Sequence, residues 1–144
     1  MVFQDFKLLP KRTVYENIAF ALEVAGEHRS RIHQVVPQVL EIVNLAHKAD
    51  SYPFQLSGGE QQRTAIARSL VHRPKIIVAD EPTGNLDSIN TAEILAILKK
   101  INEFGTTIIL VTHNRETVNH LRRRVITLHG GEIINDENEG KYKL

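Results

Sequence analysis

The sequence has 144 residues, of which 42% are hydrophobic and 24% are charged, and its formal net charge at pH 7 is +1. This balance is typical of one ordinary globular domain and argues against nucleic acid or an anionic membrane surface as the main partner. The chain has no cysteine, which excludes a disulfide framework and thiol catalysis, and no apolar run in it reaches the length of a membrane-spanning helix.

The region after a short N-terminal stretch is predicted to form two amphipathic helices. Thr13 and Glu16 stand three residues apart and form a capping box, so the first helix begins there and ends at Gly26. The second helix is expected over about residues 30–45. Pro37 lies inside its apolar pattern and should either kink the helix or mark a late start.

A second capping box opens the next predicted helix, where Ser57 is followed three residues later by Glu60. Gly58 and Gly59 carry no side chain, so another group can approach the backbone closely. A helix N-terminus carries N–H groups without intrahelical partners and a partial positive charge, which suits an anion. Taken alone, Ser-Gly-Gly-Glu is more often an ordinary cap beside a turn, because capping boxes are common.

An unbroken apolar run at residues 76–79 predicts a strand that is covered on both faces, as in a parallel sheet. Asp80 and Glu81 follow at its carboxyl end, where open α/β sheets bind their ligands. There, Asp80 could hold Mg²⁺ through water and Glu81 could polarise an attacking water. The alternative is a solvated acidic pair that starts the turn at 82–84.

A further helix and strand follow the acidic pair. Ser88 is a plausible N-cap for a helix that closes at 102–105, and the β-branched run at 106–112 predicts a strand. Strand, helix and strand at this spacing indicate a parallel sheet with a right-handed crossover. His113 would then lie at the same edge of the sheet as the acidic pair.

The last part of the chain is predicted to hold a short helix at 115–121 and a β-hairpin formed by 125–128 and 132–134. The three consecutive arginines at 122–124 are interpreted as a solvated surface. From residue 136 onward the sequence is polar, and we expect it to be frayed.

Two of these stretches resemble the motifs of a known family. Residues 56–70, LSGGEQQRTAIARSL, resemble the signature motif of ABC-type ATPases, and residues 76–82, IIVADEP, resemble their Walker B strand. The resemblance runs nearly end to end, from residues 2–4 to 129–131. The variant TGNLD at 83–87 looks most like the bacterial cell-division branch, with the lipoprotein-release and macrolide-export ATPases close behind.

The resemblance implies an α/β fold, a partial P-loop NTPase with a RecA-like parallel sheet and an α-helical ABC signature subdomain. It makes residues 1–144 one incomplete ABC ATPase domain, with 1–12 and 73–144 in the RecA-like part and 13–72 in the helical subdomain. The sequence contains no G-x-x-x-x-G-K-[ST] loop to cradle phosphates. We therefore expect the chain to be the C-terminal part of a longer ATPase and not competent by itself.

For the catalytic machinery, the resemblance implies ATP and Mg²⁺ as cofactors. It implies that Glu81 is the catalytic glutamate, that His113 is the switch histidine at the γ-phosphate, and that Asp80 holds Mg²⁺. Gln4 is implied as the Q-loop residue, which contacts Mg²⁺ and the attacking water and links the site to a transmembrane partner. Without the family, Gln4 is simply a polar residue after an apolar pair.

The resemblance also implies a dimer in which two ATP molecules lie between two head-to-tail subunits. The signature of one subunit would contact the γ-phosphate held by the other, through Ser57, Gly58, Gly59 and Glu60. Asp87 belongs to this nucleotide-binding set and would contact the partner subunit. A transmembrane subunit is the second implied partner, which places the protein in the cytoplasm at the inner face of the membrane, and no direct contact with nucleic acid is expected.

The implied function is that of the ATP-binding and ATP-hydrolysing subunit of an ABC-type membrane complex, of the cell-division kind. The alternatives are the ATPase of a lipoprotein-release or macrolide-type exporter, a soluble ABC ATPase that acts on DNA or ribosomes, and a non-catalytic interaction piece. DNA-repair relatives insert a long coiled coil after the Gln, whereas sustained heptads are absent between Gln4 and Leu56. Because a missing strand and helix would leave apolar surface uncovered, we expect the isolated chain to self-associate, swap elements or be marginally stable.

Overall fold

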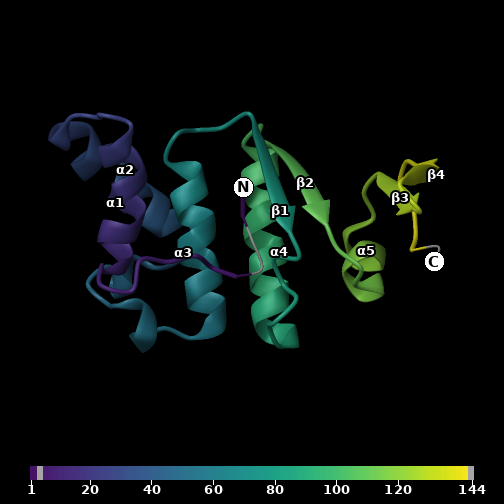
Figure 1. Cartoon of the computed structure of the whole chain (residues 1–144), viewed down its shortest axis with the longest axis horizontal. Helices are drawn as coiled ribbons and strands as arrows, with labels where there is room; N and C mark the ends of the chain where they lie inside the picture. Colours follow the sequence, from purple (N-terminus) through teal and green to yellow (C-terminus); the bar gives the residue numbers. More distant parts are fainter. Residues whose placement is uncertain (3–4, 143–144) are drawn as a thin grey trace. The chain divides into compact units, whose positions relative to one another are not determined.

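The computed structural model describes residues 1–2 and 5–142, which form two compact units, 1–111 and 112–144 (Figure 1). The elements in chain order are α1 (Val14–Val24), α2 (Arg29–Ile42), α3 (Gly58–Leu70), β1 (Ile76–Asp80), α4 (Ser88–Glu103), β2 (Thr107–Val111), α5 (Arg115–Leu121), β3 (Val125–His129) and β4 (Glu132–Glu137), with short 3-10 turns at Ala46–Lys48 and Pro53–Gln55. Gln4 lies outside the described residues, so its predicted role stays a prediction. No helix in the described ranges is both long and apolar enough to cross a membrane.

The first three helices pack against one another in the first unit. The capping box before α1 is confirmed, since the Glu16 N–H donates to Thr13 Oγ1 and Glu16 Oε2 accepts from the Thr13 N–H at 2.7 Å. Helix α2 ends three residues before the expected limit, and it runs through Pro37. The expectation of a late start is therefore wrong. Pro37 and His33 are both exposed, so the carbonyl that loses its helical partner can bond to water instead.

The sheet of the first unit is parallel, as expected. β1 pairs with β2 in the register Val78↔Ile109, and α4 forms the crossover between them. Val2 adds an isolated parallel bridge on the other side of β1, where its N–H donates to the Val78 carbonyl at 2.8 Å and its own carbonyl accepts from the Asp80 N–H at 2.9 Å. The helical cluster and this sheet belong to one unit, so the expected boundary at residues 72/73 stays a prediction.

The two faces of the β1–β2 sheet differ in burial. Ile77 and Ala79 point into the core and are 1% and 0% exposed. The core also takes fully buried side chains from the helices, namely Val14, Ile18, Leu22, Val36, Ile66 and Ile94. On the other face Ile76, Ile109 and Val111 are 56%, 49% and 48% exposed. The expectation that β1 is covered on both faces is therefore wrong, because the apolar residues of one face lie open.

The N-cap of α4 also differs from the expectation. Asp87, in extended backbone, caps this helix by accepting the Asn90 N–H at 2.8 Å, and Ser88 is the first helical residue. Asp and Ser are about equally good N-caps, so local sequence does not choose between neighbours of these types. The choice places the Asp87 carboxylate at the start of α4.

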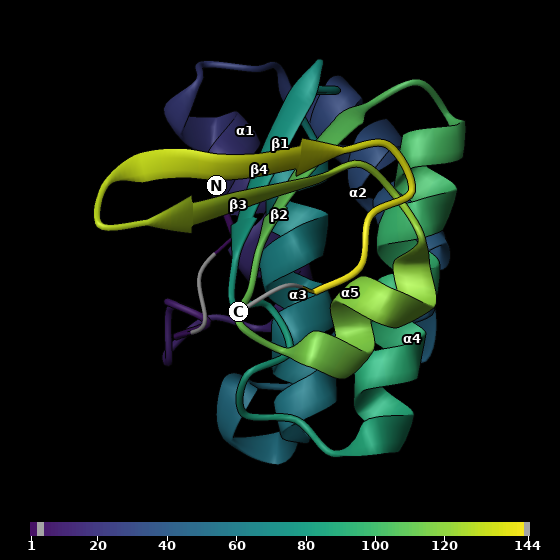
Figure 2. The same cartoon turned by 90° about the vertical axis from the view of Figure 1, so that its right-hand side faces the viewer.

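The second unit contains α5 and an antiparallel β3–β4 hairpin (Figure 2), as predicted. Gly130 and Gly131 both have positive φ, which the tight turn requires. β4 continues to Glu137, so the expectation of fraying from Asp136 onward is wrong. Asp136 accepts hydrogen bonds from Arg124 at 2.8 and 2.7 Å, and this pair lies across the hairpin.

We expect the isolated chain to self-associate through the open face of the β1–β2 sheet. In the described part of the chain β2 pairs with β1 alone, and it carries no charged residue, so it lacks the usual protection of an edge strand. Ile109→Lys places a charge in the middle of this face and should lower the mass measured by light scattering toward that of a single chain.

Ile89→Lys is the matched control, since Ile89 is 73% exposed but lies on α4. This variant should associate like the unmodified chain. A monodisperse monomer at all concentrations, before any substitution, would contradict the prediction.

Candidate functional site

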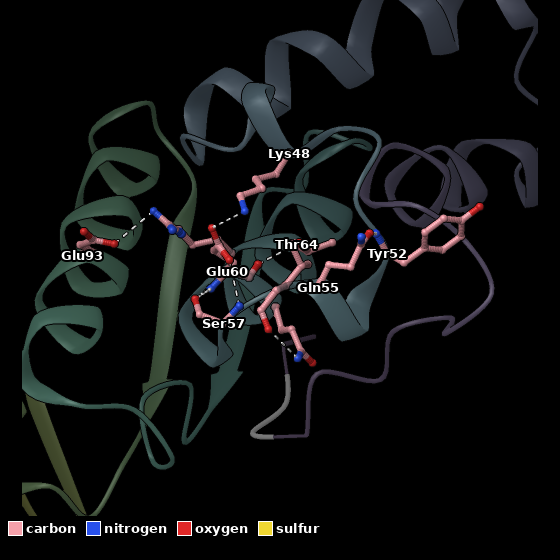
Figure 3. A network of polar contacts seen from close by, with 10 residues as sticks. Lys48, Tyr52, Gln55, Ser57, Glu60, Thr64 and Glu93 are labelled. Carbon is pink, nitrogen blue, oxygen red and sulfur yellow. Dashed lines mark hydrogen bonds and ion pairs between the residues drawn. The ribbon is translucent and has the colours of Figure 1, made fainter.

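The turn that precedes α3 is a capping box, as predicted (Figure 3). The Glu60 N–H donates to Ser57 Oγ at 3.2 Å, and Glu60 Oε2 accepts from the Ser57 N–H at 2.8 Å. Ser57 and Gly58 are exposed. The cap uses the Ser57 hydroxyl as an acceptor and leaves its O–H free to donate. The turn therefore offers a hydroxyl donor beside the first N–H groups of a helix, which suits an anion.

The largely buried Glu60 side chain stabilises this turn. Its side chain is 16% exposed, and Oε1 lies 3.8 Å from Lys48 Nζ. Burial disfavours the ionised carboxylate, but the hydrogen bonds from Ser57 and the positive charges of Lys48 and Arg63 outweigh it and hold the pKa of Glu60 below its usual value. Because the carboxylate is engaged within the turn, its predicted contact with a nucleotide stays a prediction.

An ion pair joins α3 to α4. Arg63 Nη1 lies 3.1 Å from Glu93 Oε2, and the Arg63 side chain is 11% exposed (Figure 3). The sequence does not reveal this pair, because thirty residues separate its members and no local pattern marks a contact of that range. The pair is a direct contact between the two helices, and its Glu93 end is about half exposed.

Another group packs closely against Gly59, as the absence of a side chain there predicts. The group that approaches it is the side chain of Asn90, since a Cβ placed on Gly59 would lie only 1.9 Å from Asn90 Oδ1. Asp87 accepts two hydrogen bonds from Asn90, from its backbone N–H and its side-chain amide, and these lower the pKa of Asp87. The sequence does not single out Asn90, because its contact with Gly59 depends on the packing of α3 against α4.

The acidic pair lies at the carboxyl edge of the sheet, as predicted. Asp80 is the last residue of β1 and is paired with Val111, the last residue of β2. Glu81 follows with φ +45°, a left-handed backbone, and its N–H donates to the Val111 carbonyl at 2.9 Å. Such a conformation costs about 1 kcal/mol in a residue other than Gly, and strain of this kind gathers at functional sites.

The acidic pair alone does not form a complete metal site. Within residues 1–2 and 5–142, no group of three or more His, Asp or Glu could hold a metal ion. Mg²⁺ is usually held by one or two carboxylates, with phosphate oxygens and water completing its shell. Asp80 therefore fits a magnesium ion that arrives with a nucleotide.

The remaining predicted catalytic residue, His113, lies two residues beyond the end of β2 and belongs to the second unit. Its predicted contact with Glu81 and the γ-phosphate stays a prediction. The structure thus brings together, within the first unit, the turn before α3 with the Asp87 loop, and it places Asp80 and Glu81 next to each other at the end of β1.

Known proteins resemble the chain over most of its length. A family model described as ABC transporter matches residues 1–84. The cell division ATP-binding protein FtsE of Streptococcus pneumoniae serotype 2 is 57% identical over 142 residues, which are 99% of this chain and 62% of that protein. The methionine import ATP-binding protein MetN 1 of Acinetobacter baylyi is 47% identical over 135 residues, 93% of this chain and 38% of that protein.

A solved structure of an ATP-binding cassette also resembles the chain. A dimeric ATP-binding cassette in a post-hydrolysis state bound to ADP and Pi matches with a TM-score of 0.78 and 37% identity, over 98% of this chain and 62% of that one. This likeness confirms the expected α/β fold class. The chain spans about three fifths of the length of the FtsE protein that it matches.

The Glu60 carboxylate should make the stability of the chain depend on pH. Because its pKa is lowered in the folded state, its contribution is present above the unfolded pKa of about 4.3 and is lost as the pH falls through the folded value. In urea unfolding, the unmodified chain should lose more free energy of unfolding between neutral and acidic pH than Glu60→Gln does. The Gln retains an acceptor oxygen but does not titrate.

Glu41→Gln, at an exposed position of α2, is the control and should keep the pH dependence of the unmodified chain. If Glu60→Gln and the unmodified chain show equal pH dependence, the Glu60 contacts contribute nothing to the pH-dependent part of the free energy of unfolding.

Glycine at position 81 should relieve backbone strain. Glu81→Gly is expected to have a free energy of unfolding about 1 kcal/mol above that of Glu81→Ala, since both variants lose the side chain but only Gly adopts positive φ without steric cost. Ala96→Gly, at an exposed position inside α4, should instead lower the free energy of unfolding by about 1 kcal/mol. Thermal unfolding followed by circular dichroism measures all three variants, and a Glu81→Gly no more stable than Glu81→Ala would contradict the assignment of strain.

Proposed function

Because the chain belongs to the ABC transporter family, we propose that it is the ATP-binding and ATP-hydrolysing subunit, or part of it, of an ABC-type membrane complex of the cell-division kind. The observation that carries this proposal is the acidic pair Asp80–Glu81 at the carboxyl end of β1, with Glu81 in a left-handed backbone. The 57% identity to a cell division ATP-binding protein supports the kind of complex.

In the proposed reaction, Glu81 accepts a hydrogen bond from the attacking water and takes its proton. Asp80 holds Mg²⁺, which when bound supplies positive charge to the phosphate oxygens. His113 and Gln4 complete the set as contacts to the γ-phosphate and the water. The family resemblance supports these last two roles.

The turn before α3 serves a nucleotide held by a second subunit. The Ser57 hydroxyl and the N–H groups of Gly58 and Gly59 donate to its γ-phosphate, where negative charge grows during phosphoryl transfer. Glu60 keeps the turn in shape. Asp87 contacts the partner subunit. The capping box and the exposure of Ser57 and Gly58 support this assignment.

The proposed assembly is a head-to-tail dimer of ATPase subunits bound to a transmembrane subunit, at the cytoplasmic face of the cell membrane. The similarity to a dimeric cassette supports the dimer. Because the 144 residues contain no G-x-x-x-x-G-K-[ST] loop, we expect that they turn over ATP only when polypeptide outside them supplies that loop.

A second candidate is the ATPase of an importer, favoured by the 47% identity to a methionine import ATP-binding protein. The lower identity ranks this candidate second. The membrane subunit that co-purifies with the protein distinguishes the two, since a cell-division complex and a nutrient importer have different transmembrane partners.

The test of the proposed activity joins this chain to the part of the pneumococcal FtsE that it does not match. The resulting chimaera should release phosphate from Mg-ATP, and Glu81→Gln should lower turnover at least about 100-fold, because a general base contributes that much. The same variant should retain ATP and accumulate as a dimer. Phosphate release and size-exclusion chromatography measure the two effects.

Glu41→Gln is the control, since this carboxylate is exposed on α2, and its turnover should equal that of the unmodified chimaera. Turnover by Glu81→Gln at the unmodified rate would remove Glu81 from the mechanism. Tight Mg-ATP binding by the 144 residues alone in calorimetry would mean that they contain a phosphate cradle of another kind.

A further inference from the structure

The side chain of Asn90 is held from one side by Asp87. The Asn90 N–H donates to Asp87 Oδ1 at 2.8 Å, and Asn90 Nδ2 donates to Asp87 Oδ2 at 2.6 Å. A carboxylate only accepts hydrogen bonds, so the amide nitrogen must face Asp87 and the amide oxygen must point elsewhere. Both oxygens of the Asp87 carboxylate are thus engaged by one residue.

The free side of the Asn90 amide lies on Gly59. A Cβ on Gly59 would be 1.9 Å from Asn90 Oδ1, 2.6 Å from Cγ and 3.0 Å from Cβ. Gly59 is buried, while the neighbouring Ser57 and Gly58 are exposed. The turn before α3 therefore rests on the first turn of α4 through a contact that leaves room for a hydrogen atom and nothing larger.

Two other contacts accompany this one. Leu86 packs against Gly58, since its Cδ2 lies 3.3 Å from the place of a Cβ there, and the Arg63–Glu93 pair joins the helices one turn further along. Because this pair and the apolar core do not involve Asn90, α3 and α4 stay packed when the Asn90 amide is removed. The effect of such a change is confined to the turn.

We propose that Asn90 is a positioning residue that links the turn at Ser57–Gly59 to the Asp87 loop, so that the placement of the turn depends on where Asp87 holds the Asn90 side chain. The inference rests on the proposed function, in which the turn and Asp87 both face a neighbouring subunit. If Asp87 turns its carboxylate toward that subunit, the Asn90 side chain loses its hydrogen bond to Asp87. Its packing against Gly59 then becomes looser. The placement of the phosphate-binding turn then depends on the contact that Asp87 makes.

Amide hydrogen exchange on the 144-residue chain tests this contact directly. Asn90→Ala should accelerate exchange in the turn before α3 by about twofold, the effect of losing a few van der Waals contacts. It should also return the pKa of Asp87 toward its usual value, because the hydrogen bond from the Asn90 side chain is lost. Asn90→Asp keeps the shape but sets a second carboxylate against Asp87, so it should behave like Asn90→Ala. Ser88→Ala, at the exposed neighbouring position, should leave exchange unchanged.

Exchange in the turn that is equal in Asn90→Ala and in the unmodified chain would overturn the proposal. Gly59→Ala provides a second arm, since its methyl group must displace Asn90 and raise the pKa of Asp87. If this variant does not fold, Gly59→Ala combined with Asn90→Gly should fold, because it makes room for the methyl group. The proposed contact would be contradicted by an unchanged Asp87 pKa in Gly59→Ala, or by a double variant that also fails to fold. Either result would show that the Asn90 side chain does not pack against Gly59.

The chimaera described above separates positioning from stability. Asn90→Ala should lower kcat by up to about 100-fold, the cost of a misplaced binding group, while the Kd for Mg-ATP stays within about twofold, since the phosphate loop holds the nucleotide. Ser88→Ala should keep the unmodified kcat. An unchanged kcat in Asn90→Ala would overturn the positioning role. An inactive unmodified chimaera would contradict the proposed function instead, and the exchange experiment would then decide the role of Asn90.

Discussion

The parallel pairing of β1 with β2 constrains most of the first unit. Parallel strands need a crossover, and α4 supplies it by crossing one face of the sheet. That face becomes the core, and the other remains open. The pairing also puts Asp80 and Glu81 at the edge where β2 ends. Since α3 lies beside α4 (Figure 1), the turn before α3 meets the loop before α4.

The site combines relaxed and strained parts. The turn at Ser57 is a satisfied capping box, so it holds its shape without help from a ligand. Glu81 has the opposite character, because its left-handed backbone is tolerated only while the hydrogen bond to Val111 and the surrounding strands fix it. Under the proposed roles, a rigid turn suits a group that binds phosphate, and a fixed backbone at Glu81 suits a general base that must point toward the attacking water.

Local patterns predicted local structure well. The capping boxes at 13–16 and 57–60 and the hairpin glycines involve neighbours in sequence, so their chemistry is complete within a few residues. The N-cap of α4 was misplaced by one residue because Asp and Ser cap equally well. The contacts Arg63–Glu93 and Gly59–Asn90 join positions about thirty residues apart, and only the packing of α3 on α4 brings them together. The open face of β1 was mispredicted because an apolar run shows only that a strand can be buried on both faces. It does not show that another element packs on each face.

The bridge between Val2 and Ala79 has a consequence for the order of events during synthesis. Residue 2 leaves the ribosome long before its partner, and at about 5–20 residues per second the delay is about 4–15 s. Helices α1 to α3 are complete within that interval and can form their mutual contacts. Val2, which is 1% exposed in the finished fold, stays hydrated until β1 emerges. Val2 can therefore pair with β1 only after the residues of α1 to α3 have all been synthesised.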